Sequence, residues 1–405
     1  MSATNGVSVI DGDGHVVEPP DLWTSRMDQR RWGDLIPRFD QQERAWYVGG
    51  VQRWGGSDNL QRVIKHVPTT ADELREITRS LQHPGAYDPH ERIKVMDRDG
   101  MDAAVLYPTR SLFYGPIDPI DAIRDPEFAT DVLRAYNDWI AEFCSAHPSR
   151  LFALAALTLA DIDLACAEAE RAVNKLGLRG VMVRPAPYIG ELPFSNAVYD
   201  RFWDTVQGLD VPVAFHPSVH IDVPGACRKY RLVHPSENIL ITNMMVDPEH
   251  GGSALGQAIG NTCDMMVTMA RILMGGVAER FPQLTFLFLE SGGGWVPTQL
   301  ERMDEQVELF WLERKWLSIL PSEYFKRQCY VSFDPGEWNL AASAGFLGSD
   351  RILWASDFPH PEYKPEVVSE LKKNLSTLPD KDQRNILAEN EIKAYRLPLK
   401  AMEAA

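Results

Sequence analysis

Two residues near the N-terminus have types and spacing that suit a metal ion. Asp13 and His15 stand two residues apart in IDGDGH, at the end of an apolar run. On an extended strand, side chains two residues apart point to the same face. A carboxylate oxygen and an imidazole nitrogen placed in this way can close on one divalent ion. An Asx turn with a capping histidine is the structural alternative for this pair.

Eight short apolar runs, bounded by turn residues, are the elements that must position these groups. They predict strands over residues 7–13, 103–109, 151–157, 180–185, 211–216, 284–290, 329–334 and 351–357. The runs are apolar on both faces, which is typical of a parallel sheet covered on each side. Helical patterns alternate with them over residues 89–99, 128–147, 164–176, 196–208, 255–281 and 296–325. This alternation predicts an α/β fold, a (β/α)8 TIM barrel.

The length of the chain predicts insertions in that barrel. The chain has 405 residues, whereas a plain barrel needs about 250. Two connections are too long for simple loops, residues 16–87 after the first strand and 217–252 after the fifth. Both follow barrel strands, so we expect both to cover the C-terminal mouth. We expect one domain over 1–405, with residues 364–405 as a closing segment.

The polar residues that end the predicted strands should meet at that mouth, where barrels of this kind build their active sites. The first strand ends in Asp11, Asp13 and His15, and the later ones end in Arg184, His216, Glu290, Asp334 and Asp357. Arg184 suits bidentate pairing with a substrate carboxylate, and a surface ion pair is its structural alternative.

Composition and charge exclude several classes of partner. The chain has 41 Lys and Arg against 57 Asp and Glu, a formal net charge of −16. This charge repels phosphate backbones and anionic lipid, so we expect neither a nucleic acid nor a membrane partner. The N-terminus lacks a secretory signal pattern. The five cysteines are scattered without a CxxC pair, which suits reduced thiols and a cytoplasmic location.

Four phrases of the sequence resemble one enzyme superfamily. They are DGDGHVVEPPDLW, YDPHERIKVMDRDGMDAAVLYPT, LESGGGWVP and WASDFPHPE. Together they resemble the amidohydrolase superfamily. More narrowly, they are similar to the amidohydrolase-related branch that includes aminocarboxymuconate semialdehyde and resorcylate-type decarboxylases. The resemblance runs from about residue 7 to about residue 370, which is nearly the whole predicted barrel.

The resemblance implies a metal site made of Asp13, His15, His216 and Asp357. The first pair is usually His-x-His in this superfamily, and here Asp13 takes the first place. His216 matches the strand-five ligand, and Asp357 matches the strand-eight aspartate that binds metal or holds the activated water. Such a site suits a divalent metal and would lower the pKa of a bound water. Strand four offers Arg184 and no bridging lysine, so we expect one metal, zinc first, with manganese and iron as alternatives.

Glu290 marks a departure from the decarboxylases. They carry a histidine that acts as general acid and base, and this chain has Glu290 in LESGGGW. Glu290 takes over that role, becomes an extra metal ligand, or orients a ligand histidine without binding the metal itself. His360 is a further catalytic candidate, with a structural loop histidine as the alternative. His220 is a candidate substrate contact, because Pro217 separates it from His216 and makes a shared metal doubtful.

We therefore expect a metal-dependent enzyme that acts on a small organic acid by metal-activated hydrolysis or non-oxidative decarboxylation. Asp357 or Glu290 would move the proton. Two alternatives stay open, a non-haem iron oxygenase (hydroxylase) of the same fold and a metal-binding partner subunit of such an oxygenase. The predicted helix 255–281 is apolar around much of its circumference. For that reason we expect a homo-oligomer, with a hetero-oligomer containing a homologous chain as the alternative.

Overall fold

The structure is a computed structural model, and it describes residues 8–43, 45–55, 83–113, 125–185, 188–190, 192–217, 257–310, 312–360 and 362–401. Most of the predicted insertion 217–252, with His220 in it, lies outside these residues, and so do residues 56–82 of the first insertion. All eight predicted barrel strands lie within the described part of the chain.

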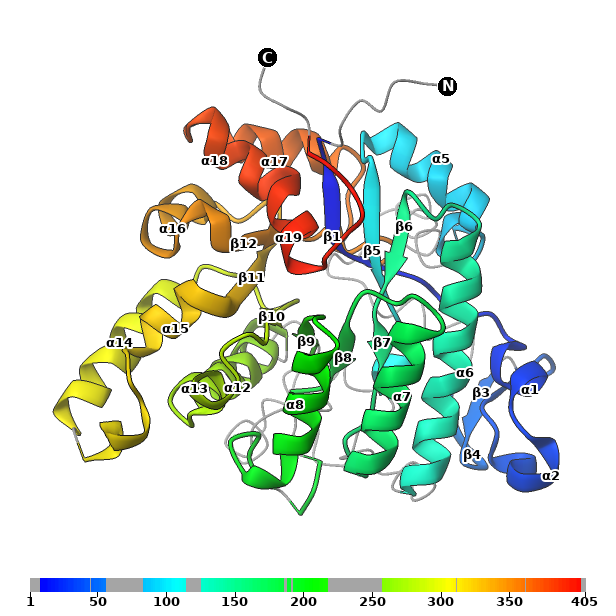
Figure 1. Ribbon diagram of the computed structural model, residues 1–405. Coiled ribbons are helices and arrows are strands. Elements are labelled where there is room, and N and C mark those ends of the chain that lie inside the picture. Colours follow the sequence, from blue (N-terminus) through cyan, green and yellow to red (C-terminus); the bar gives the residue numbers. More distant parts are fainter. Residues whose placement is uncertain are drawn as a thin grey trace, which may run out of the picture.

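Each predicted strand is present, and each is shorter than predicted (Figure 1). In most runs the buried apolar centre forms the strand and the polar end lies beyond it in a loop, whereas β1 contains its polar residues and extends to His15. Leu154 splits the third strand into two segments. The strands are β1 (Ile10–His15), β5 (Ala103–Tyr107), β6 (Leu151–Ala153), β7 (Ala155–Ala156), β8 (Val181–Val183), β9 (Val213–Phe215), β10 (Phe286–Phe288), β11 (Cys329–Phe333) and β12 (Ile352–Trp354).

The strands are parallel and follow one another in the order of a barrel. One sheet has the order β1-β5-β6, and the second runs from β7 through β8, β9, β10 and β11 to β12. The chain itself joins the two sheets between β6 and β7. At the other seam, the Asp357 N–H donates to the Asp13 carbonyl over 3.1 Å, and the His15 N–H donates to the Phe358 carbonyl over 2.6 Å. The predicted α/β fold with parallel strands is confirmed.

Aromatic side chains pack the barrel wall around β9. The Phe215 ring stacks on Phe286 and Phe288, with centroids 6.3 and 5.5 Å apart. Trp203, from the helix before β9, meets Phe215 edge-on at 6.4 Å. All four side chains are fully buried, and truncating such a residue to Ala costs about 3–5 kcal/mol. This packing fixes the end of β9, which His216 directly follows.

Helices follow most strands and cover the outside of the sheets (Figure 1). Three of them begin at an aspartate, Asp88, Asp125 or Asp161, whose side chain accepts a hydrogen bond from the first turn. The outer helices are α5 (Pro89–Asp99), α6 (Pro126–Ser145), α7 (Ile162–Asn174), α8 (Asp200–Gly208), α12 (Thr262–Leu273), α13 (Val277–Arg280), α14 (Val296–Leu309), α15 (Pro321–Gln328) and α16 (Leu340–Leu347). Short helical turns are η2 (Pro84–Ala86), η3 (Ser111–Phe113), η5 (Ala197–Tyr199), η6 (Gln257–Asn261), η7 (Glu313–Trp316) and η8 (Ser349–Arg351). None of the described helices is both long and apolar enough to cross a membrane.

Two predicted helices are interrupted. The pattern over 255–281 predicted one helix, but α12 ends at Leu273 and α13 begins at Val277. Gly276 lies between them with φ +78°, a left-handed conformation that ends a helix. The pattern over 296–325 likewise becomes α14, η7 and α15. Apolar periodicity continued across these breaks because each piece buries a face against the same core.

The described part of the first insertion packs along α6. It contains α1 (Leu22–Arg26), α2 (Gln29–Trp32), η1 (Gly33–Leu35) and an antiparallel sheet of β2 (Arg38–Asp40), β3 (Ala45–Val48) and β4 (Val51–Gly55). Trp23 Nε1 donates to the Val132 carbonyl of α6 over 3.0 Å. Trp46 lies under the Arg110 guanidinium, 4.7 Å from it, and so meets the loop after β5. Coverage of the mouth by residues 16–87 stays a prediction.

The C-terminal residues run beside the beginning of β12. They form α17 (Val367–Leu375), α18 (Asp380–Arg384), η9 (Asn385–Glu389) and α19 (Asn390–Ala394). Asn390 Nδ2 donates to the Ile352 carbonyl over 2.7 Å, where β12 begins. Figure 1 shows α19 next to β1, at the opposite end of the chain. The described part of the predicted closing segment therefore lies against the barrel strands.

Candidate metal centre

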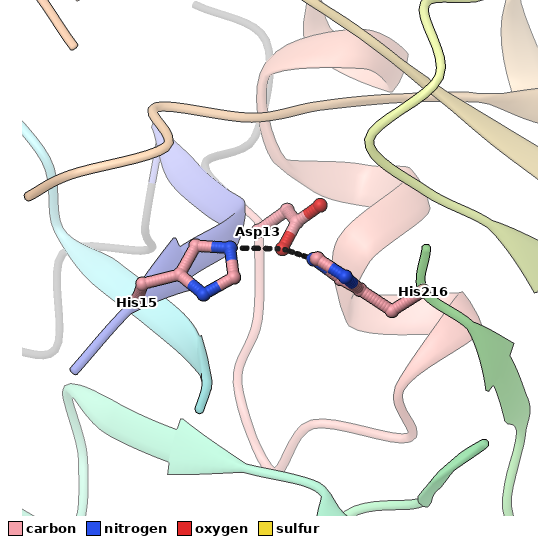
Figure 2. Close-up of side chains that lie close together, drawn as sticks. All are labelled: Asp13, His15 and His216. Carbon is pink, nitrogen blue, oxygen red and sulfur yellow. Dashed lines mark ion pairs between the residues drawn. The ribbon is translucent and has the colours of Figure 1, made fainter. Parts of the chain in front are cut away.

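Four side-chain atoms face one another at the ends of β1, β9 and β10. His216 Nε2 lies 3.0 Å from Glu290 Oε2 and 3.5 Å from Asp13 Oδ1. His15 Nε2 lies 3.6 Å from Asp13 Oδ1 and 4.0 Å from Glu290 Oε2. Figure 2 shows one carboxylate oxygen of Asp13 between the two imidazole rings. The strand ends thus bring together a histidine pair and two acids from distant parts of the sequence.

All four facing atoms are buried and lack a hydrogen-bond partner within the described part of the chain. They are Asp13 Oδ1, His15 Nε2, His216 Nε2 and Glu290 Oε2. Burying one such atom without a partner costs about 1–3 kcal/mol, so four of them around one point indicate a shared partner. Ligands about 2.1 Å from one metal ion lie between about 3.0 Å (adjacent positions) and about 4.2 Å (opposite positions) from each other. The observed separations of 3.0 to 4.0 Å fit a divalent cation between these atoms.

Backbone carbonyls set the tautomer of both histidines. His15 Nδ1 lies 2.8 Å from the Pro108 carbonyl, and His216 Nδ1 lies 2.8 Å from the Pro217 carbonyl. A carbonyl oxygen can only accept, so each Nδ1 carries the proton. When the imidazole is neutral, each Nε2 presents its lone pair to the centre, which is the form that binds a metal.

A bulge in β1 aims Asp13 at the centre. Asp11 pairs with Ala104 and Gly14 pairs with Leu106, so three steps along β1 match two along β5. The extra residue of a bulge redirects the side chains next to it. Asp13 and His15 do meet, as predicted from their spacing. Both residues belong to β1, and the register shift lies on the N-terminal side of Gly14.

Both acids at the ends of later strands have an uncommon backbone conformation. Glu290 has φ +46° and Asp357 has φ +55°. A non-glycine residue in this region costs of the order of 1–3 kcal/mol, and such residues cluster at functional sites. The Glu290 N–H donates to Ser332 Oγ over 3.2 Å, and the Asp357 N–H donates to the Asp13 carbonyl. The loops therefore hold both carboxylates in place at the cost of backbone strain.

Asp357 and His360 form a hydrogen-bonded pair beside His15. Asp357 Oδ1 lies 3.5 Å from His15 Nε2 and 2.7 Å from His360 Nδ1. His360 Nε2 lies 3.0 Å from Thr109 Oγ1, and its ring lies against the His15 ring, tilted by 31° with centroids 4.0 Å apart. Burial disfavours the charged imidazole, but the Asp357 carboxylate outweighs it and raises the pKa of His360 to about 9.

Burial and mutual repulsion set the charges of the other groups. Burial raises the pKa values of Asp13 and Asp357 above the ordinary aspartate value. Burial, with His360 and His216 close by, lowers the pKa of His15. Burial also opposes the charged form of His216, but the nearby carboxylates outweigh it and raise its pKa. A divalent cation at this point would keep the acids ionised, displace the His216 proton and lower the pKa of His15 further.

The structure places the other predicted residues outside this cluster or outside the described part. Arg184 follows β8 and is buried, and its backbone N–H donates to Tyr188 Oη over 2.7 Å. Its role as a carboxylate clamp stays a prediction. His220 is not among the described residues. Asp334 directly follows β11 and is exposed, and its place at the mouth stays a prediction.

Three residues that support the site were not predicted from the sequence. Thr109 contacts His360, and Ser332 accepts the Glu290 N–H. Glu337 accepts hydrogen bonds from the Gly293 and Gly294 N–H groups in the loop after Glu290. Thr109 and Ser332 lie at or near strand ends, so a complete inventory of polar residues at strand ends would have found them. Glu337 has no such signal, because its role depends on the fold of a neighbouring loop.

Comparison with known proteins shows the family of the chain. An amidohydrolase family model matches residues 10–397. Gamma-resorcylate decarboxylase of Rhizobium radiobacter is 28% identical over 296 residues, which cover 69% of this chain and 80% of that protein. An amidohydrolase from Mycobacterium avium subsp. paratuberculosis K-10 has a similar structure, with a TM-score of 0.73 and 22% identity, over 97% of this chain and 100% of that one. The structure of a dihydroxybenzoic acid decarboxylase from Polaromonas sp. JS666, with bound manganese and the inhibitor 2-nitroresorcinol, is also similar. Its TM-score is 0.62 and its identity is 20%, over 97% of this chain and 98% of that one. The match over most of the chain shows that it belongs to the amidohydrolase family.

Proposed function

We propose that the chain is a metal-dependent decarboxylase that removes carbon dioxide from a small aromatic acid without an oxidant. The observation that carries this proposal is the set of four unpartnered atoms that face one another in the barrel. The similarity to gamma-resorcylate decarboxylase supports decarboxylation over hydrolysis. It gives no support to the oxygenase, or to a partner subunit of one.

Asp13, His15, His216 and Asp357 are the proposed metal ligands, and Glu290 joins them. The Glu290 carboxylate does not orient a ligand histidine from outside, because both histidine Nδ1 atoms already bond to backbone carbonyls. Its Oε2 atom instead faces His216 Nε2 at 3.0 Å. Of the three roles that the sequence left open for Glu290, the geometry favours that of an extra ligand.

Manganese replaces zinc as the first choice for the metal. The proposed set contains three carboxylates and two imidazoles, and oxygen-rich sets suit Mn²⁺ better than the closed nitrogen and sulfur sites typical of Zn²⁺. The similar decarboxylase from Polaromonas sp. JS666 binds manganese. Iron and zinc remain the alternatives for a site of this composition.

We assign proton delivery to Asp357 and His360. A bound metal would supply Lewis-acid polarisation of the substrate. In decarboxylation the bond between the ring carbon and the carboxylate breaks, carbon dioxide leaves, and a proton must replace it on that carbon. Protonated His360, whose Nδ1 lies 2.7 Å from Asp357 Oδ1, can pass a proton through Asp357 to that carbon. The hydrogen bond to Thr109 keeps the His360 ring oriented with Nδ1 toward Asp357.

Arg184 and His220 remain the proposed contacts to the substrate. Arg184 is buried at the end of β8, and a buried guanidinium suits a carboxylate or phenolate by bidentate pairing. We propose that the insertions after strands one and five cover the mouth and select the substrate. The cytoplasmic location predicted from the cysteines belongs to this proposal as well.

A homo-oligomer also belongs to the proposal. Leu309, Phe310 and Leu312, at the end of α14, are 67%, 54% and 65% exposed. Apolar side chains gathered at one exposed helix end are typical of a subunit contact. Light scattering tests this part, and a mass close to the 45.7 kDa of one chain would contradict it.

Carbon dioxide release in the absence of oxygen tests the proposed activity. Protein loaded with Mn²⁺ is incubated under nitrogen with a panel of hydroxybenzoates, and the released carbon dioxide and the decarboxylated phenol are measured together. We expect equal amounts of both products from at least one substrate, and none from protein treated with a chelator. Turnover that requires oxygen would favour the oxygenase, and release of an amine or alcohol by water would favour hydrolysis.

A further inference from the structure

One tyrosine of the C-terminal segment forms a hydrogen bond to the strand that carries Asp13. Tyr395 follows α19 and is fully buried. Its Oη donates to the Gly12 carbonyl over 2.7 Å, across 383 positions of sequence. It also accepts a hydrogen bond from Tyr107 Oη at 3.1 Å. Figure 2 shows the faint red ribbon of the C-terminal residues behind Asp13 and the two histidines.

The Gly12 carbonyl belongs to the bulge that aims Asp13. Between Asp11 and Gly14 the register of β1 shifts against β5, so this carbonyl needs a partner outside the ladder. The same peptide plane carries the Asp13 N–H, which donates to Asp11 Oδ1 over 3.3 Å. Tyr395 therefore holds one side of the plane and Asp11 holds the other. Because this plane leads into Asp13, fixing it limits where the Asp13 carboxylate can lie.

The surroundings of the bulge leave little room for it to shift. A Cβ atom on Gly12 would lie 3.1 Å from the Trp354 carbonyl and 3.2 Å from Glu391 Cγ, so β12 and α19 enclose the glycine. The Tyr107 ring lies 5.4 Å from the His216 ring and 6.2 Å from the His15 ring, centroid to centroid. Tyr107 thus lies against both histidine rings, and Tyr395 bonds to the strand that carries Asp13.

We propose that Tyr395 is a positioning residue of the metal centre and that the C-terminal segment contributes to metal affinity through it. This inference rests on the metal centre proposed above. Residues outside the ligand set that orient ligands typically change metal affinity by about 10–100-fold when they are removed. By reciprocity, bound metal should also tighten the docking of α19 on the barrel.

Replacement of Tyr395 by Phe tests the inference, because it removes the hydroxyl and keeps the ring. Tyr136→Phe is the matched control, since Tyr136 is fully buried and its Oη has no hydrogen-bond partner within the described residues. We measure the Mn²⁺ dissociation constant by competition with a chelator, and the unfolding transition with and without Mn²⁺. We expect Y395F to raise the dissociation constant about 10-fold or more and to shrink the metal-induced rise in Tm, whereas Y136F changes neither.

Equal loss of stability with and without Mn²⁺, at an unchanged dissociation constant, would make Tyr395 a purely structural residue and overturn the inference. Failure of the parent protein to bind Mn²⁺ would overturn the proposed function and the inference together. Tight binding by both the parent and Y395F would overturn the inference alone.

Hydrogen exchange of the parent protein gives a second test that needs no variant. We expect Mn²⁺ to slow amide exchange in α19 and at Tyr395, and to leave exchange in α7 (Ile162–Asn174), on the outer side of the barrel, unchanged. Exchange in α19 that does not respond to Mn²⁺ would contradict the coupling even if Y395F were too unstable to purify.

Discussion

His216 Nε2 lies 3.0 Å from Glu290 Oε2, and neither atom forms a hydrogen bond within the described part of the chain. The two residues follow β9 and β10, which are neighbours in the sheet. Both atoms are buried, so water does not satisfy them as it would at the surface. A cation between them and the first-strand pair resolves the unpaired donors and acceptors and the concentration of acids at one point.

Glu290→Gln tests whether Glu290 is a ligand. The change keeps the size of the side chain and removes its negative charge, so we expect the Mn²⁺ dissociation constant to rise by about 10-fold or more. The fold should be unchanged, as circular dichroism can verify. Glu305→Gln is the control, because the Glu305 side chain is 61% exposed. Unchanged affinity with lost activity would instead make Glu290 a group that transfers protons.

His360→Gln separates proton delivery from metal binding. His360 Nδ1 bonds to Asp357 and is not one of the four facing atoms. We expect carbon dioxide release to fall by at least about 100-fold, which is typical for loss of a general acid or base, while the Mn²⁺ content stays at the parental level. His90→Gln, on the exposed side of α5, should change neither quantity. Loss of Mn²⁺ from the His360 variant would assign His360 to the metal and refute its role in proton delivery.

Glu337→Gln tests a pH dependence of stability that arises from a residue outside the ligand set. Glu337 accepts hydrogen bonds from the N–H groups of Gly293, Gly294 and Asp334. Burial nevertheless raises its pKa from 4.5 to about 7. The folded chain therefore holds this proton more tightly than the unfolded chain, and its contribution to stability is lost as the pH rises from about 4.5 to about 7.

Urea unfolding of metal-free protein at pH 5 and pH 8 measures this effect. Between these two values, the unfolding free energy of the parent should fall by about 2 kcal/mol more than that of the glutamine variant. Glutamine stays neutral at both values and keeps a carbonyl that can accept the glycine N–H groups. An equal fall in both proteins would show that Glu337 does not titrate in this range.

Much of the site could be predicted because its residues occupy a repeated structural position. Asp13 and His15 lie in the last half of β1, and His216 directly follows β9. Glu290 and Asp357 come two and three residues after β10 and β12. In a parallel barrel such positions meet at one mouth. Apolar runs located the strands, and the strands then located the polar residues. For Asp334, which directly follows β11 and is exposed, the same rule stays a prediction.

What the sequence could not provide depends on contacts between distant segments. The bulge at Gly12 is held by Tyr395, which lies 383 positions later. Local spacing predicted that Asp13 and His15 meet, but it could not predict the bulge before them or the residue that bonds to it. The break at Gly276 is a similar case, since the apolar pattern continues on both sides of it. Periodicity reports which face is buried, and it does not report where the backbone changes direction.

Metal content per chain tests the central claim most directly. Parent protein, His216→Ala and the exposed control His90→Ala are loaded with Mn²⁺, desalted and analysed by plasma mass spectrometry, with circular dichroism as the check on folding. We predict about one divalent ion per chain in the parent and in the control, and almost none in folded His216→Ala, because that variant loses one of the four facing atoms. An unchanged metal content in His216→Ala, or a parent that retains no ion, would contradict the account.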